Sequence, residues 1–297
     1  MEEPQAPPQV SVLLVSYNAA DALRRCLAAL EQSSEREKFE IVVVDNGSQD
    51  GSAEVPAEFP NVTALRLPRN FGFVKALNIG MRTGKGEFFL FLSPRTEVMA
   101  DTVAALAARL EQEPGAVAVC PALTTPGGER APHLFKLPRP GSVGAIAAAG
   151  RFEAASIPED AGETVAVEFA GFAALLVRSY FLKGLRFIDE RYAQSWADAE
   201  VAIQIYRAGK KTLLAPGVRG VWHAEDDLRS SMPAGPVALL AADWALGAAT
   251  FAGKHFGGAA GLKVRIGTAL AALFSLQFRR FLHLVSGQKI DGTQTSM

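Results

Sequence analysis

Polar residues that could bind a ligand follow two apolar segments near the start of the chain. Val10–Val15 leads into Ser16-Tyr17-Asn18, and Ile41–Val44 leads into Asp45-Asn46-Gly47-Ser48. A helical pattern lies between the two segments, which predicts a β-α-β unit with these groups at the carboxyl ends of its strands, where open α/β sheets bind ligands. No Gly-x-Gly-x-x-Gly follows the first strand, so the dinucleotide fingerprint is missing. Carboxylate, amide and hydroxyl groups in these positions suit hydrogen bonds to a base or a sugar.

The elements that must position these groups alternate along the first 121 residues. Short, continuous apolar runs are typical of strands buried in a parallel sheet. The pattern predicts strands near Val10–Ser16, Phe39–Asp45, Val62–Leu67, Glu87–Leu92 and Ala116–Pro121, and helices near Ala20–Gln32, Lys75–Thr83 and Ala100–Glu113. Further on it predicts a long loop over Thr124–Gly162 with one helix near Val143–Ala149, strands at Thr164–Phe169, Lys211–Ala215 and Gly220–His223, and helices at Arg178–Leu185 and Asp198–Ala208.

Composition limits the class of protein. The chain has 297 residues and a formal net charge of −1, so it carries no basic excess that would indicate nucleic-acid binding. Cys26 and Cys120 fall within predicted elements and are interpreted as small buried side chains. Residues 1–8 are acidic and rich in proline, without the pattern of a signal peptide, so we expect a disordered tail on a cytoplasmic protein.

The last part of the chain has a different composition. From residue 226 onward we expect a helical region with two long alanine-rich helices, at about Pro236–Lys254 and Ala259–Leu284. The apolar stretch Ile266–Leu276 is too short to span a bilayer. Two interpretations stay open: the helices lie at a membrane surface, at the inner face of the cell membrane, or they pack on the core or on the second subunit of a homodimer.

An ordered set of motifs resembles a known family. Ser16-Tyr17-Asn18, Asp45-Asn46-Gly47-Ser48, Asn70-Phe71-Gly72-Phe73 with Asn78, and Phe91-Leu92-Ser93-Pro94 occur in the order found in family 2 glycosyltransferases. The bacterial rhamnosyltransferase-like branch is the most similar. The resemblance covers residues 9–225 and implies an α/β fold of the GT-A (nucleotide-diphospho-sugar transferase) type, a Rossmann-like sheet, with residues 226–297 as a C-terminal helical extension.

The resemblance also assigns a nucleotide pocket. It implies that Asp45 accepts a hydrogen bond from the pyrimidine ring of the donor, which a carboxylate can do with the ring N–H. The residues expected to bind the nucleotide are Ser16, Tyr17, Asn18, Asp45, Asn46, Gly72, Phe73 and Asn78. The alternative is that Asp45-Asn46-Gly47-Ser48 is only a turn, since these are turn-forming residues.

The expected diphosphate or metal region departs from the family pattern. Related proteins carry an acidic, metal-binding motif where this chain has Ser93-Pro94-Arg95. Either Arg95 neutralises the donor diphosphate itself, since a guanidinium fork suits phosphate oxygens, or the site is degraded. Glu97 could supply a carboxylate, and the resemblance implies that His223 binds a metal or the diphosphate. No cofactor is certain from the sequence, and Mn²⁺ or Mg²⁺ is the metal that such a site would take.

The resemblance places the catalytic base at Asp198. Inverting transfer needs a carboxylate that takes the proton of the acceptor hydroxyl. The acidic residue that normally precedes this base is replaced by Ala197, and Trp196 and Glu200 are expected on the acceptor side. The plain alternative is that Asp198 is a helix N-cap with Glu200 in the first turn.

Together these residues predict a glycosyltransferase. It would move a sugar with inversion from a dTDP- or UDP-sugar donor to a glycan or a lipid-linked acceptor. The competing hypothesis is a non-catalytic protein that binds nucleotide sugars or acts as a scaffold, because acidic side chains are missing at residues 95 and 197.

Overall fold

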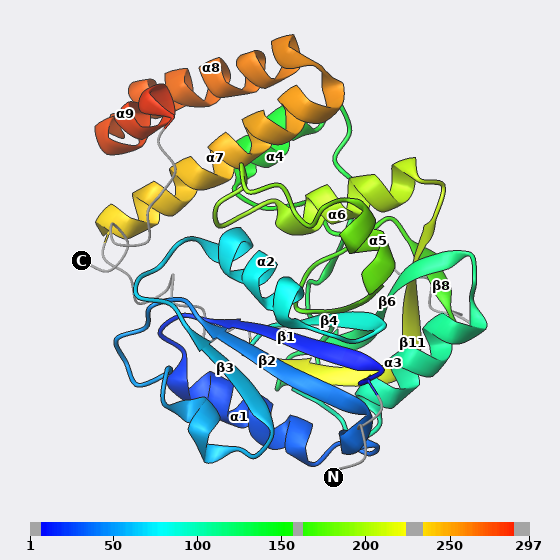
Figure 1. The fold of residues 1–297 in the computed structure, drawn as a ribbon. Helices are drawn as coiled ribbons and strands as arrows, with labels where there is room; N and C mark the ends of the chain where they lie inside the picture. Colours follow the sequence, from blue (N-terminus) through cyan, green and yellow to red (C-terminus); the bar gives the residue numbers. More distant parts are fainter. Residues whose placement is uncertain (1–6, 157–162, 224–233, 288–297) are drawn as a thin grey trace.

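The fold was analysed in a computed structural model that describes residues 7–156, 163–223 and 234–287. A central sheet carries helices on both faces, with a helical layer above one of them (Figure 1). The strands are β1 (Val10–Ser16), β2 (Phe39–Asp45), β3 (Val62–Arg66), β4 (Phe88–Leu92), β5 (Thr96–Val98), β6 (Ala116–Thr124), β7 (Leu134–Phe135), β8 (Val165–Val167), β9 (Phe169–Ala170), β10 (Ala174–Arg178) and β11 (Lys211–Trp222). The α-helices are α1 (Ala20–Glu31), α2 (Phe73–Thr83), α3 (Thr102–Gln112), α4 (Val143–Ala149), α5 (Ser179–Gly184), α6 (Ala197–Arg207), α7 (Ala234–Phe256), α8 (Gly258–Phe274) and α9 (Phe278–Ser286). Short 3₁₀ turns lie at Arg36–Lys38 and Val55–Glu58.

The large sheet is mixed. Its order is β3-β2-β1-β4-β10-β6-β11-β5, with β8 also paired to β11. The first four strands in this order are mutually parallel, while β10 runs antiparallel to both β4 and β6. The predicted Rossmann-like α/β sheet is therefore confirmed, and β1, β2 and β4 end at the same edge.

Side-chain alternation along β1 explains why both faces of the sheet are covered. Val12 and Leu14 pack with α1 and α3 on one face, whereas Leu13 packs with α2 on the other. Cys26 and Cys120 are free and buried, one in each of these two clusters. Burial raises the pKa of both thiols.

Several elements of the structure differ from those predicted. The pattern predicts no strand over 174–178 and begins a helix at Arg178, yet β10 is there, in the middle of the sheet. The two strands predicted between residues 211 and 223 are one strand, β11, with an irregularity between Ala215 and Arg219. The second long helix is two helices, because Leu276 adopts a φ of 56° between α8 and α9. No Gly or Pro marks that break in the sequence.

The C-terminal helices are joined to the sheet domain by packing. Trp244, Ala248 and Phe251 of α7 belong to the same hydrophobic cluster as α2 and α6, and the indole of Trp244 donates a hydrogen bond to the Ile146 carbonyl of α4 at 3.0 Å. The predicted tail (residues 1–8) and the predicted boundary at residue 225 fall largely or wholly outside the described residues. Of the helices described, none has both the length and the apolar character needed to cross a membrane.

Candidate active site

A cleft of about 460 Å³ opens at the carboxyl edge of β1 and β4. This volume lies in the range of small-molecule sites. The lining residues come from β1, α2, β4, the loop before α6, and α7; among them are Tyr17, Asn46, Phe73, Ser93, Arg95, Phe172, Gln194, Trp196, Asp198 and Trp244. The sequence analysis did not predict Phe172, Gln194 and Trp244 as lining residues. The only feature that could have indicated them is the aromatic side chain of Phe172 and Trp244.

Asp198 stands in the wall of this cleft, in the first turn of α6. Its Oδ1 accepts a hydrogen bond from the backbone N–H of Ala199 at 2.8 Å. Burial raises the pKa of the Asp198 carboxyl to about 6, and that backbone bond offsets the effect only in part. The helix begins one residue earlier, at Ala197, and no side chain caps it, so the interpretation of Asp198 as the N-cap is wrong. A carboxyl with a raised pKa in a cleft is a candidate general base.

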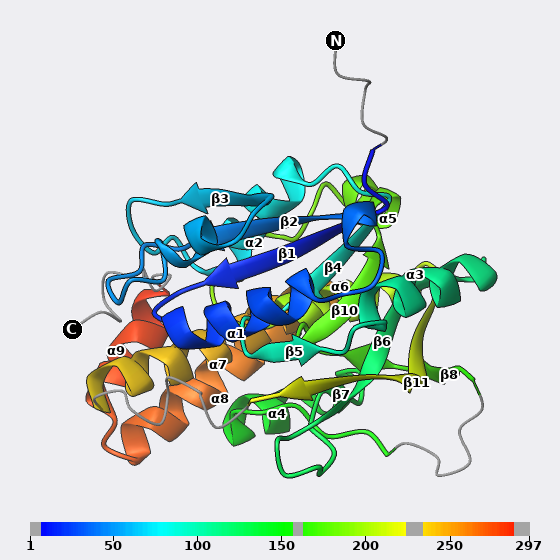
Figure 2. The ribbon, with the colours of Figure 1, turned by 90° about the horizontal axis from the view of Figure 1, so that it is seen from below.

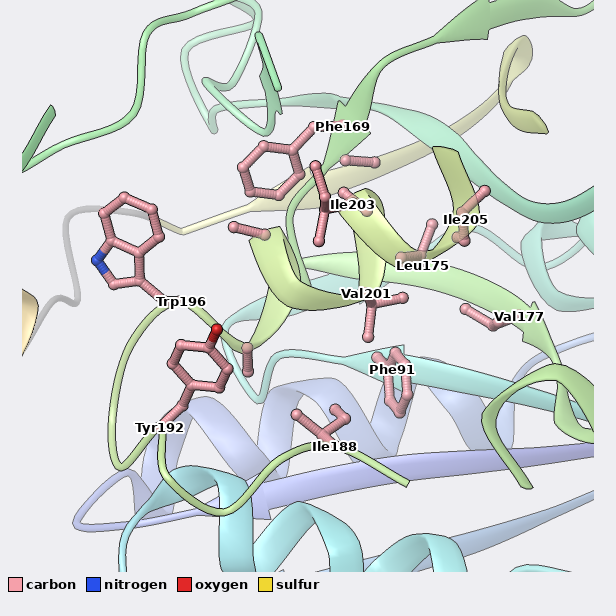
Figure 3. Packing of buried hydrophobic residues seen from close by; sticks show 14 of the residues in the cluster. Phe91, Phe169, Leu175, Val177, Ile188, Tyr192, Trp196, Val201, Ile203 and Ile205 are labelled. Carbon is pink, nitrogen blue, oxygen red and sulfur yellow. The ribbon is translucent and has the colours of Figure 1, made fainter. Parts of the chain in front are cut away.

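Trp196 fixes the approach to Asp198. It has a φ of 71°, and its buried ring packs against Phe152, Trp244 and Phe251 at centroid distances of 4.9, 5.4 and 5.2 Å. Figure 3 shows Trp196 and Tyr192 on the loop that enters α6, at the edge of the hydrophobic cluster. The aromatic cluster holds the loop in place and also forms one wall of the cleft.

Glu200 points away from the cleft into a buried polar network. Its carboxylate accepts hydrogen bonds from Tyr192 Oη at 2.8 Å, Gln204 Nε2 at 2.8 Å and Lys254 Nζ at 2.8 Å, and it contacts His255 Nε2 at 2.7 Å. Burial alone would raise the pKa of Glu200, but the bonds from His255, Gln204 and Lys254 outweigh it and lower that pKa to about 2. This residue, expected on the acceptor side, joins α6 to α7 instead of lining the cleft.

The turns after β1 and β2 are tied together. The Asn18 backbone N–H donates to Ser48 Oγ at 3.0 Å, and Asn18 Oδ1 accepts from the Gln49 N–H at 2.9 Å. Asn18 has a φ of 46°, a conformation that asparagine tolerates better than most residues. The amide oxygen of Asn18 therefore already has a hydrogen-bond partner within the protein. Asn18 holds the two turns in position.

Asp45 retains an unsatisfied oxygen. Its side chain is 3% exposed, and Oδ2 accepts from the Ser48 N–H at 3.1 Å, whereas Oδ1 has no hydrogen-bond partner among the described residues. Ser16 Oγ is likewise buried without a partner in the described part of the chain. Asp45 lines a second hollow of about 370 Å³, with Gly47, Gln49 and Arg66. A buried acceptor without a donor is costly, so this oxygen is suited to a ligand N–H.

Asn46 and Gly72 shape the turn that precedes α2. Asn46 Nδ2 donates to Asn70 Oδ1 at 2.9 Å, and Asn46 Oδ1 accepts from the Phe71 N–H at 2.9 Å. Gly72 has a φ of 92°, and a Cβ there would lie 3.2 Å from the Ala193 carbonyl oxygen. The turn thereby presents Phe73 to the cleft.

Asn78 lies behind the cleft wall, not in it. Its Nδ2 donates to the Ile188 carbonyl at 2.8 Å and to Glu190 Oε1 at 3.1 Å, and its Oδ1 accepts from the Ile188 N–H at 3.1 Å. All of these partners belong to the segment that leads to Trp196, so Asn78 acts on the site through that segment.

The residues predicted to bind the diphosphate or a metal lie in two separate places. Ser93 and Arg95 line the cleft, and the Arg95 N–H donates to Ser93 Oγ at 3.2 Å. Glu97 does not line it: its Oε1 lies 3.5 Å from Arg25 of α1 and 3.0 Å from His223 Nε2. Within residues 7–156, 163–223 and 234–287, no three His, Cys, Asp or Glu side chains converge as metal ligands do. These residues do not fit a divalent ion, since a cation faces the cleft and the nearby carboxylate is paired.

Comparison with known proteins gives this fold a family. The model of Glycosyl transferase family 2 matches residues 11–161, about half of the chain. This chain belongs to glycosyl transferase family 2. That membership confirms the resemblance predicted from the motifs.

Individual family members match parts of the chain. Glycosyltransferase AglE of Haloferax volcanii is 37% identical over 90 residues, covering 29% of this chain and 30% of that protein. The N-acetylglucosaminyl-diphospho-decaprenol L-rhamnosyltransferase of Mycobacterium tuberculosis is 24% identical over 231 residues, covering 71% of this chain and 75% of that enzyme.

Solved structures share the fold. TarS 1–349 of S. aureus matches with a TM-score of 0.56 and 13% identity, covering 94% of this chain and 92% of that one. TarS 1–349 in complex with UDP-GlcNAc also gives a TM-score of 0.56, with 17% identity over 84% of this chain and 72% of that one. At these identities the likeness carries the GT-A fold alone.

Proposed function

We propose that this protein is an inverting glycosyltransferase that uses a pyrimidine nucleotide sugar. It transfers one sugar from a UDP- or dTDP-sugar to a hydroxyl of a glycan or a lipid-linked acceptor. The observation that carries the proposal is Asp198, a carboxylate with a pKa of about 6 in the wall of the main cleft. Such a group is ionised at neutral pH and is a stronger base than an ordinary aspartate.

In the proposed reaction Asp198 takes the proton of the acceptor hydroxyl. The hydroxyl oxygen attacks the anomeric carbon from the side opposite the leaving nucleoside diphosphate, so the anomeric configuration inverts. Arg95, in the same cleft, neutralises charge that develops on the diphosphate. The half-buried Trp244, which packs on the buried Trp196 ring, lines the cleft and suits the apolar face of a sugar ring.

The unsatisfied Oδ1 of Asp45 supports a pyrimidine donor. Uracil and thymine each present a ring N–H that can donate to this oxygen. The relatives add support, since one is named a rhamnosyltransferase and one solved neighbour contains UDP-GlcNAc. Both features are consistent with a UDP- or dTDP-linked sugar.

Nucleotide binding is tested by thermal shift. UDP and dTDP should raise the melting temperature, and Asp45→Asn should weaken binding by about tenfold or more, because one charge-assisted hydrogen bond contributes about 1.5–3 kcal/mol. The control is Asp101→Asn, because this carboxylate is exposed and its side chain makes no capping hydrogen bond. Asp50 is unsuitable because its carboxylate accepts a hydrogen bond from the Ala20 backbone N–H. Equal shifts from ATP, GTP and UDP would contradict a pyrimidine site.

Transfer is tested by nucleotide release and by the product's anomeric configuration. We expect UDP or dTDP to be released from a matching nucleotide sugar, and Asp198→Asn to lower the rate by roughly 10²-fold or more, with Asp101→Asn unchanged. A protein that binds nucleotide sugars tightly and releases no nucleotide with any of a panel of sugars and acceptors would support the scaffold hypothesis. Retention of configuration would exclude the single-displacement mechanism.

A further inference from the structure

The C-terminal helices carry a series of exposed apolar side chains. In α8 they are Leu262, Ile266, Leu270 and Phe274, which are 59, 50, 45 and 81% exposed. Residues four apart lie along one face of a helix, so these four form a single stripe. Leu276, Phe278, Leu282 and Val285 extend it into α9 with exposures between 57 and 74%. We call these eight residues the apolar stripe.

The opposite side of α8 is already used for packing. Gly261, Thr268 and Ala272 are buried, and a Cβ at residue 261 would lie 2.7 Å from the Ala249 carbonyl oxygen of α7. The apolar stripe is therefore the free side of a helix that is firmly attached by its other face. Exposed apolar patches of this kind mark contact surfaces in soluble domains.

Charge indicates what covers the apolar stripe. From residue 244 to residue 286 the chain has no Asp or Glu, but it has Lys254, Lys263, Arg265, Arg279 and Arg280, in a protein whose net charge is −1. Lys263 and Arg279 are exposed beside the stripe. Lys254 is paired with Asp189 and Glu200, and Arg265 donates to the Leu284 and Val285 carbonyls, so the cations beside the stripe are Lys263 and Arg279. The segment itself supplies no negative charge to balance them.

A second copy of the chain fits this surface poorly. In a two-fold dimer the same patch meets itself, so these cations would face cations with no carboxylate of the segment to pair with. A bilayer surface with anionic lipids fits both features, because the apolar side chains enter the acyl boundary while Lys and Arg meet the headgroups. We propose that α8 and α9 dock this protein on an anionic lipid bilayer through the apolar stripe.

The placement of the stripe connects it to the cleft. In both ribbon views α9 and the carboxyl end of β1 lie toward the same end of the molecule (Figures 1 and 2). The helix between them, α7, contributes Trp244 to the cleft wall and packs against α8 and α9. Docking through the stripe would therefore place the helices that pack against the cleft wall at the lipid boundary. This holds whatever the acceptor is.

Co-sedimentation of the full chain with lipid vesicles tests the proposal without any enzymatic activity. We expect sedimentation with vesicles of phosphatidylcholine and phosphatidylglycerol, and much less with phosphatidylcholine alone. Raising the ionic strength from about 0.1 to about 1 M shortens the Debye length from about 10 to about 3 Å and should release most of the protein.

Two exposed substitutions separate the apolar and the charged contributions. Phe274→Ser should lower the partition coefficient about tenfold, and Arg279→Gln about fivefold. Their matched controls are Tyr180→Ser, a 57% exposed aromatic residue on α5, and Lys210→Gln, an exposed cation in the turn between α6 and β11. Neither control should change the partition coefficient.

Failure of the anionic vesicles to sediment the protein would overturn the proposal, as would undiminished binding of Phe274→Ser. A concentration-dependent dimer that Phe274→Ser dissociates, with no vesicle binding, would assign the stripe to a second copy. Because the vesicles contain no sugar acceptor, loss of lipid binding and loss of glycosyl transfer are measured independently.

Discussion

Polar side chains in and around the cleft differ in whether the protein already satisfies them. The amides of Asn18, Asn46 and Asn78 bond to backbone or to other side chains, so they position loops. Asp45 Oδ1 is buried without a partner among the described residues, and the half-buried Asp198 carboxyl faces the cleft with one backbone hydrogen bond. The motifs predicted which residues gather near the strand ends, but not which of their atoms face protein, because that depends on contacts with distant segments such as Ile188–Glu190.

The pH dependence of the reaction should follow Asp198. Because its pKa is raised to about 6, the base becomes protonated below that value, and turnover should fall about tenfold for each further pH unit. A rate profile from pH 4.5 to pH 8 checks this. A profile that stays flat to pH 5 would mean that another group takes the proton.

Asp198 should make the folded state less stable as the pH rises, whereas it should make turnover faster. Since its folded pKa lies above the ordinary value of 3.8, its contribution to stability is fully present at low pH and is lost as the pH rises through 6. At pH 7.5 the Asp198→Asn variant should therefore unfold at a higher temperature than the native protein. Its free energy of unfolding should be larger by roughly 1–3 kcal/mol. At pH 4 the two should unfold alike, as differential scanning calorimetry can measure.

Arg95 should make the nucleotide complex independent of metal. At about 4 Å and an effective dielectric constant near 20, two unit charges interact by about 4 kcal/mol, so a fixed cation opposes a divalent ion nearby. We expect Mn²⁺ titration in the presence of UDP to give no tight binding, and a chelator to leave turnover unchanged. Arg95→Asp should create a requirement for Mn²⁺, whereas Lys210→Asp on the surface should not. Turnover abolished by chelator in the native protein would contradict this prediction.

At the level of elements, sequence periodicity predicted the strands that enter the cleft and missed those that complete the sheet. β1, β2 and β4 are continuous apolar runs with turn residues after them. β10 follows an apolar segment in which a single glycine, Gly171, is the only turn-forming residue, and β5 has only three residues, so local pattern did not separate either from its surroundings. The GT-A fold followed from the ordered motifs and is confirmed; the mixed centre of the sheet is a tertiary property.

The link between α6 and α7 is expected to be a major source of stability. Glu200→Gln leaves the buried His255 beside a neutral amide and removes one of the two carboxylates that pair with Lys254, which should lower the unfolding free energy by roughly 1.5–3 kcal/mol. Glu153→Gln, which removes an exposed ion pair with Lys136, should cost about 0–1 kcal/mol. Denaturant unfolding of both variants gives the comparison.

The Glu200 carboxylate should also make the stability of the protein depend on pH in acid. Its folded pKa of about 2 lies below the ordinary value of 4.5, so its stabilising effect is present above pH 4.5 and disappears as the pH falls toward 2. The native protein should therefore lose its advantage over Glu200→Gln in that interval. An advantage that persists at pH 2 would show that the network acts by packing alone.

For the whole molecule, the C-terminal helices and the cleft form one packed body through α7. A Cβ at Gly247 would lie 2.6 Å from Cδ1 of Trp196, so Gly247→Ala must displace either the helix or the indole. We expect a loss of roughly 1–3 kcal/mol and a lower turnover, since Trp196 leads into the turn that carries Asp198. Gly267→Ala, in α8 with nothing within 4 Å, should instead stabilise by up to about 1 kcal/mol and leave turnover unchanged.

The position of β10 also bears on how the chain acquires its fold during synthesis. The family match ends at residue 161, yet β4 and β6 are joined only by the strand at Ala174–Arg178, which the ribosome makes later. Until that strand emerges, the apolar strands β4 and β6 each have an open edge, a situation that favours wrong association of nascent chains. The segment that defines the family is thus not a self-sufficient folding unit in this protein, because the strand that closes the centre of the sheet, and β11 after it, lie beyond residue 161.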